Sequence, residues 1–131
     1  MYAELTITPT TGETFGAFGK RVYDAIMTTI GINRIVKIFM TPMNKNGNEM
    51  EWNISSRNDT GAWIILTAIH VFLPNVYFYA CQICGNESTP SINTAQSGQY
   101  NLSNSSYYKD TDLNGSGIVS NTKYVRLVYI P

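Results

Sequence analysis

The longest apolar stretch of the chain runs from Trp63 to Ile83, and a polar stretch of about 37 residues, 85–121, follows it closely. The segment from Trp63 to Leu73 carries large apolar side chains at both odd and even positions, which is typical of an internal strand covered on both faces. Pro74 interrupts the stretch, and Val76 to Ile83 predicts a second strand. We therefore expect a sheet built around these two strands.

Weaker patterns predict the other elements. Further strands are expected at Tyr2 to Thr8, Arg34 to Thr41, Glu49 to Ser55 and Lys123 to Ile130. Apolar residues at steps of three or four predict one face of a helix: Phe15, Phe18, Val22, Ile26 and Ile30. Thr10 and Glu13 have the spacing of a capping box at its start, and Gly31 is the expected cap at its end.

These elements predict one α+β, mainly β domain over residues 1–131. It would contain an antiparallel sheet or sandwich of about six strands and one N-terminal amphipathic helix, with 85–121 as a long polar excursion. We expect the last strand to lie at an edge of the sheet, where a neighbouring chain can pair with it.

The charge of the chain narrows the choice of partners. Charged residues make up 14% of the sequence and the formal net charge is +0, whereas about 25% is typical of globular proteins. We therefore expect neither nucleic acid nor membrane as a partner, because both recruit proteins through positive charge. A net charge near zero favours association, so we expect a homo-oligomer. Met1 to Glu4 lacks the basic start of a signal peptide, which predicts synthesis in the host cytoplasm.

The histidine and cysteine residues, which often carry catalysis, have no recognisable catalytic or metal-binding partners in the sequence. His70 is the only histidine, and it stands in an apolar strand. Cys81 and Cys84 form a lone C-x-x-C without a second pair of zinc ligands. A core histidine and two buried thiols are the simpler interpretation, and we expect no enzymatic activity.

The polar excursion supplies the candidate ligand-binding residues, which are Tyr100, Asn101, Asn104, Tyr107 and Tyr108. Aromatic rings can stack on sugar rings while amides bind their hydroxyl groups. The same mixture is typical of a wet protein–protein interface, where tyrosine and asparagine give adaptable contacts. An ordered excursion without a specific ligand is the third interpretation.

A calcium loop is the one candidate cofactor site. Asp110, Asp112 and Asn114 match the start of the pattern D-x-D-x-N-G, in which alternate side-chain oxygens converge on a calcium ion. The twelfth position is Asn121 instead of the usual glutamate, so an Asn-Gly turn is the alternative. Apart from calcium, no cofactor is expected.

In overall character the chain resembles small virion components, above all the fibre-tip, decoration and tail proteins of bacteriophages. The resemblance lies in short length, β-rich pattern, low charge and many Asn and Thr residues, and it involves no motif. It implies a non-enzymatic structural protein of the virion (fibre, spike, decoration or tail) that acts by self-assembly and contacts other virion proteins. The alternative is a carbohydrate- or receptor-binding module, calcium-assisted, whose partner is a host glycan.

The glycan-binding alternative predicts that Tyr107→Ala or Tyr108→Ala weakens retention on a glycan array while the circular dichroism spectrum is unchanged. The reason is that an alanine offers no ring for a sugar to stack on. An array without hits, both with and without calcium, would contradict this alternative.

Overall fold

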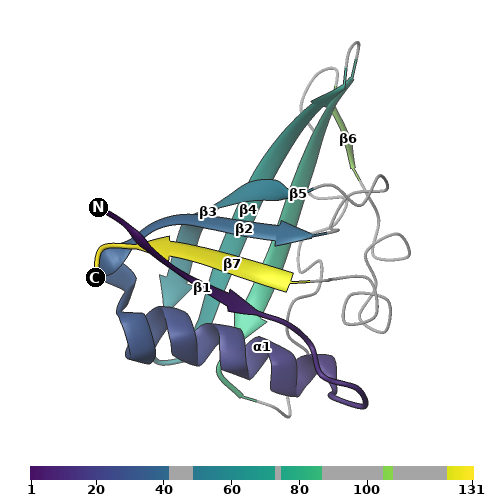
Figure 1. Cartoon of the computed structure of the whole chain (residues 1–131). Helices are drawn as coiled ribbons and strands as arrows, with labels where there is room; N and C mark the ends of the chain where they lie inside the picture. Colours follow the sequence, from purple (N-terminus) through teal and green to yellow (C-terminus); the bar gives the residue numbers. More distant parts are fainter. Residues whose placement is uncertain (42–48, 73–74, 87–104, 108–123) are drawn as a thin grey trace.

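The computed structural model describes residues 1–41, 49–72, 75–86, 105–107 and 124–131. In this part of the chain a mostly antiparallel sheet curls into a half-barrel, with one short α-helix beside it (Figure 1). The prediction of a mainly β protein is confirmed. The described strands form one sheet, not two packed sheets.

The sheet has seven strands in the order β1-β7-β2-β3-β4-β5-β6. Their bounds are β1 (Ala3–Ile7), β2 (Ile35–Thr41), β3 (Met50–Asn58), β4 (Trp63–Phe72), β5 (Asn75–Cys84), β6 (Ser105–Tyr107) and β7 (Tyr124–Tyr129). All neighbours are antiparallel except β5 and the short β6. Because β7 is antiparallel to both of its neighbours, β1 and β2 run in the same direction and the last strand fills the gap between them.

The prediction that the last strand lies at an edge is therefore wrong. Leu127 of β7 pairs with Leu5 of β1 on one side and with Ile38 of β2 on the other. Val125 and Leu127 have no exposed surface. The position of a strand in the sequence does not determine its position in a sheet. Here the helical connection between β1 and β2 leaves room for one strand between them, and β7 occupies that place.

The connection between β1 and β2 contains α1 (Phe15–Asp24), the π-helical segment η1 (Ala25–Ile30) and the short 3-10 helix η2 (Ile32–Arg34). Gly31 follows η1 with φ 99°, a conformation that suits glycine because it has no Cβ. The expected glycine cap is thus present, at the end of a π-helical turn.

The start of the helix differs from the capping-box prediction. The N-cap is Thr14, whose hydroxyl accepts a hydrogen bond from the Ala17 N–H at 3.1 Å. Thr10 and Glu13 instead form a turn before the helix: the Glu13 N–H donates to the Thr10 carbonyl at 3.0 Å, and the Thr10 N–H donates to the Glu13 carboxylate at 3.1 Å. Gly12, at φ 80°, lies inside this turn. The Glu13 carboxylate accepts from the Thr10 N–H as a capping box requires, but this contact closes a turn, and the helix begins only at Phe15.

The core lies between the helical segment and the inner face of the sheet. Phe18, Val22 and Ile26 have no exposed surface and belong to one buried cluster with residues of the strands. The strand residues buried most completely are Ile38, Met40, Trp52, Ile64, Leu66, Ile83, Val125 and Leu127. Burying one such side chain contributes about 1.5–3 kcal/mol, so this interface accounts for much of the stability of the fold.

Strand β4 is internal, as its sequence predicts, but only its inner face is fully covered. Ile64 and Leu66 are 0% exposed, whereas Ile69 on the other face is 60% exposed. The expectation of two covered faces is wrong at Ile69, because α1 covers only the inner side of the sheet.

We predict that Phe18→Ala lowers the free energy of unfolding by about 3–5 kcal/mol, because it opens a cavity between α1 and the sheet. Urea denaturation followed by circular dichroism measures the change. The control is Thr28→Ala at an exposed position of η1, where about 0.5 kcal/mol or less is expected. Equal losses in the two variants would contradict this description of the core.

Candidate functional site

Most of the residues predicted to bind a ligand lie outside the described part of the chain. These are Tyr100, Asn101, Asn104 and Tyr108 for the glycan and Asp110, Asp112 and Asn114 for calcium. Tyr107 ends β6, where its backbone lies beside Phe78 of β5, and nothing further is described of it. Both hypotheses stay predictions.

Two other candidates are partly described. The Cys84 side chain is buried, as the structural interpretation of the C-x-x-C pair expects, while the side chains of His70 and Cys81 lie outside the description. Among the described residues no group of three or more His, Cys, Asp or Glu side chains could hold a metal ion.

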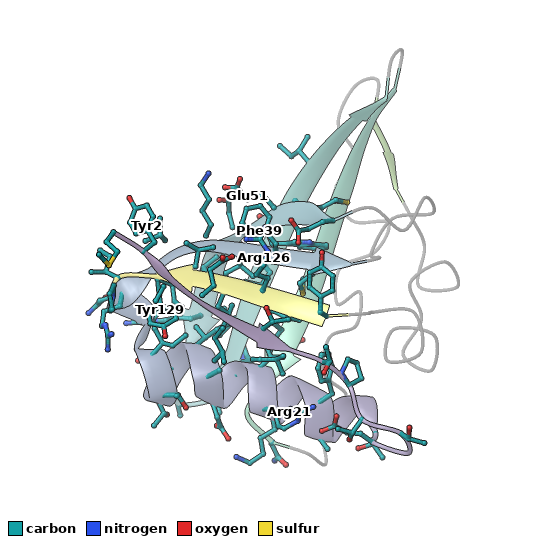
Figure 2. The ribbon with its side chains drawn as sticks, in the orientation of Figure 1. Tyr2, Arg21, Phe39, Glu51, Arg126 and Tyr129 are labelled. Carbon is teal, nitrogen blue, oxygen red and sulfur yellow. The ribbon has the colours of Figure 1, made fainter. Side chains whose placement is uncertain are left out.

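The most developed polar arrangement that the structure describes surrounds Arg126 on the outer face of the sheet. Strand alternation sends Val125 and Leu127 into the core and Arg126 outward. The register places Arg126 between Thr6 of β1 and Phe39 of β2. Figure 2 shows Arg126 and Phe39 together on this face, whereas Tyr129 lies toward the core.

The guanidinium of Arg126 joins three segments that lie far apart in the sequence. Its Nη2 and Nε donate to the two carboxylate oxygens of Glu49, at 2.7 and 3.1 Å. Its Nη1 donates to Glu4 of β1. Its Cζ lies 4.1 Å from the centroid of the Phe39 ring, within cation–π range. We call Glu4, Phe39, Glu49, Tyr124 and Arg126 the Arg126 cluster.

The electrostatics of the cluster favour the charged forms of Glu49 and Arg126 and the neutral form of Tyr124. The hydrogen bond from Arg126 lowers the pKa of Glu49, with a smaller contribution from the Tyr124 hydroxyl, which donates to Glu49 at 2.6 Å. The same bond to Glu49 raises the pKa of Tyr124. Hydrogen bonds to Glu49 and Glu4 raise the pKa of Arg126. Each guanidinium nitrogen donates to a carboxylate, so Arg126 holds these segments together.

Next to the cluster the outer face has an open hollow of about 360 Å³. It is lined by Tyr2, Glu4, Val36, Lys37, Phe39, Arg126 and Val128. Its walls are mainly apolar. Besides Arg126 it contains one cation, Lys37, whose Nζ lies 3.9 Å from Oε1 of Glu51 on β3. Such a surface suits contact with an apolar side chain better than binding of a small charged ligand.

Exposed apolar side chains gather at the end of the sheet beside this hollow. In the described part of the chain the large exposed apolar residues are Met1, Tyr2, Val36, Ile69 and Ile130. All except Ile69 belong to the same end of β1, β7 and β2, where Ala3 and Ile35 both pair with Tyr129. Figure 1 shows the two termini side by side at this end. We call Met1, Tyr2, Val36 and Ile130 the terminal apolar cluster.

Arg34 fixes the backbone that carries this cluster. Its Nε donates to the Ile130 carbonyl at 2.7 Å, and the Ile130 N–H donates to the Arg34 carbonyl at 2.9 Å. Its Nη1 also donates to the Ile30 carbonyl at the end of η1, at 3.1 Å. Ile130, 52% exposed, therefore projects from a backbone position held by two hydrogen bonds to Arg34, and the third bond ties Arg34 to the end of η1.

Comparison with known proteins finds no match: no protein-family model, no curated protein and no solved structure is significantly similar to this chain. None of the described helices is long and apolar enough to cross a membrane. Functional inference therefore depends on the geometry described above.

Reasoning from the sequence did not find the Arg126 cluster. Arg126 is 122 residues from Glu4 and 77 residues from Glu49 along the chain. The one local signal is a charged residue between two buried ones in the last strand. Its partners become identifiable only when the strand order is known.

We predict that Glu49→Gln destabilises the protein at neutral pH and that this difference disappears in acid. The folded pKa of Glu49 is below its ordinary value of 4.5, so its stabilising contribution is complete above that value and is lost as the pH falls through the folded pKa. Urea midpoints measured between about pH 7 and about pH 3, a range that includes the ordinary pKa of a glutamate, test this expectation.

The matched control is Glu51→Gln, whose carboxylate is 46% exposed and makes a single pair with Lys37. Its free energy of unfolding is expected to differ little from that of the wild type at any pH, because exposed ion pairs contribute little. Parallel curves for wild type and Glu49→Gln over the whole range would refute the stabilising role of Glu49.

Proposed function

We propose that this protein is a non-enzymatic structural subunit that acts by self-association, as a component of a virion. The terminal apolar cluster carries the proposal. Exposed apolar side chains scattered singly are normal on a protein surface, whereas a contiguous group indicates a contact surface. Among the described residues, four of the five exposed large apolar side chains belong to one end of the sheet.

The surroundings of the cluster support a role in assembly. The hydrogen bonds of Arg34 hold the Ile130 backbone. On the neighbouring outer face the Arg126 cluster joins β1, β2 and Glu49, the residue before β3. A contact surface on fixed strands loses little conformational entropy when a partner binds, which favours affinity. The amphipathic helix near the N-terminus completes this α+β scaffold from the inner side.

The virion setting is supported by composition. The charged fraction of 14% and the net charge of +0 leave little repulsion between copies. We propose a fibre, spike, decoration or tail component of a bacteriophage, made in the host cytoplasm and incorporated into the particle beside other virion proteins.

We predict that the purified protein forms a discrete oligomer and that Val36→Lys combined with Ile130→Lys weakens it. Two lysines at the contact would have to lose their hydration, so the concentration required for association should rise by roughly tenfold or more. Light scattering after gel filtration, over a concentration series, measures the mass.

The matched control is Ile69→Lys, which changes the fifth exposed apolar residue, on β4, away from the cluster. It should associate as the wild type does. A wild-type protein that stays monomeric at high micromolar concentration would overturn the proposed function.

A further inference from the structure

The outer edge of β1 is open in the described part of the chain. β1 pairs with β7 on one side and stands at the end of the strand order, whereas the other end of the sheet carries the short β6. An open edge displays backbone N–H and carbonyl groups to which another strand can bind.

The hydrogen bonds of β7 identify which groups β1 displays. The Ile130 N–H donates to Arg34, so the backbone of residue 130 points toward β2. Neighbouring residues in a strand point in opposite directions, so Tyr129 and Leu127 point toward β1 and form hydrogen-bonded pairs with Ala3 and Leu5. The backbone groups of the residues between, Glu4 and Thr6, therefore point outward.

An independent contact agrees with this direction. By the same alternation the Thr8 carbonyl should also point away from β7, and it accepts a hydrogen bond from Nη2 of Arg21, on α1, at 2.7 Å. Glu13 fixes that guanidinium through Nε at 2.8 Å and Nη2 at 2.7 Å.

The edge lacks several of the usual protections against pairing. Natural edge strands are often blocked by lysine, proline or a β-bulge. The sequence of β1, AELTI, has neither residue, and its pairing with β7 is regular from Ala3 to Ile7. The irregularities of the sheet lie elsewhere, between Ile35 and Lys37 and between Ile54 and Ser56.

We propose that the open edge of β1 binds β1 of a second copy of this chain, antiparallel, about a two-fold axis at Leu5. This inference rests on the proposed function, because it adds a contact at the β1 edge to the one proposed for the terminal apolar cluster. The two half-barrels would join into one continuous sheet, with Glu4 of each copy paired with Thr6 of the other.

The positions of the outward groups and the charges select this register. An axis at Glu4 would place two carboxylates directly opposite each other, which is unfavourable. An axis at Thr6 would place Tyr2 opposite Thr10, beyond Pro9, which has no N–H. An axis at Leu5 pairs Glu4 with Thr6 on both sides of the axis. Tyr2 and Thr8, which flank β1, then face each other, and the Thr8 carbonyl keeps its hydrogen bond from Arg21.

The side chain of Leu5 also fits this position. It is half-buried and packs against the core cluster from the inner face. At the axis the two Leu5 residues would form a non-hydrogen-bonded pair, in which side chains approach most closely. Each would cover the surface that the other leaves exposed.

The first test is Thr6→Pro, which removes an outward N–H and leaves the hydrogen bonds between β1 and β7 in place. Because of the two-fold axis, the substitution removes one intermolecular hydrogen bond from each copy. The concentration required for association should therefore rise by roughly tenfold or more. Thr6→Val keeps the N–H and the branched side chain, and it should associate as the wild type does. Circular dichroism checks that both variants fold.

The second test is Leu5→Cys under mild oxidation. A non-hydrogen-bonded pair has Cα atoms about 4.5 Å apart, which a disulfide can span. A covalent dimer is expected, and peptide mapping should place its disulfide at position 5. The control Thr6→Cys should not link to its own copy, because that register holds the two Cα atoms roughly 8 Å apart, beyond disulfide reach.

The outcomes separate the two proposals. If the wild type associates, but Thr6→Pro associates equally well or Leu5→Cys gives no link at position 5, edge pairing is overturned and self-association stands. If the wild type is monomeric throughout, both are overturned.

Discussion

The placement of β7 between β1 and β2 is the constraint on which the rest of the structure depends. The strand β7 is formed from the last residues of the chain and pairs with the first strand and with the strand that follows the helix. Without it, β1 would have no neighbour in the described sheet, because its only recorded pairing is with β7. Such contacts span nearly the whole sequence, so the sheet forms through non-local pairing, which is entropically costly and slow.

Side chains on both faces of β7 hold it between β1 and β2. On the inner face Val125 and Leu127 are fully buried in the core beneath α1. On the outer face Arg126 binds Glu49 with two nitrogens and Glu4 with a third, so one side chain connects four segments of the sheet region. Burial supplies most of the stability, and the directional ion pairs add geometric specificity that apolar contacts lack.

The sequence predicted what depends on local pattern. Apolar periodicity identified six of the seven described strands, all except the short β6. It also identified the helix residues Phe18, Val22, Ile26 and Ile30, all of which are buried. It failed where the outcome depends on distant segments. The edge position expected for the last strand was wrong because strand order is a non-local property. The Arg126 cluster was missed for the same reason, and the turn at Thr10 and Glu13 was mistaken for a helix start because both arrangements use the same carboxylate contact.

An open sheet edge and a low charge suit a protein that associates with other copies, whereas both would favour aggregation of a protein that must remain monomeric. Monomeric proteins protect their edges with charges or bulges because unprotected edges aggregate. Here the one ionisable side chain of β1, Glu4, is engaged by Arg126 on the outer face and leaves the outward backbone groups of the strand accessible. The charge that would normally guard the edge is thus used to fix the strand in position. A fixed strand loses less entropy on pairing than a loose one, so the same ion pair that completes the fold also prepares β1 for a second copy.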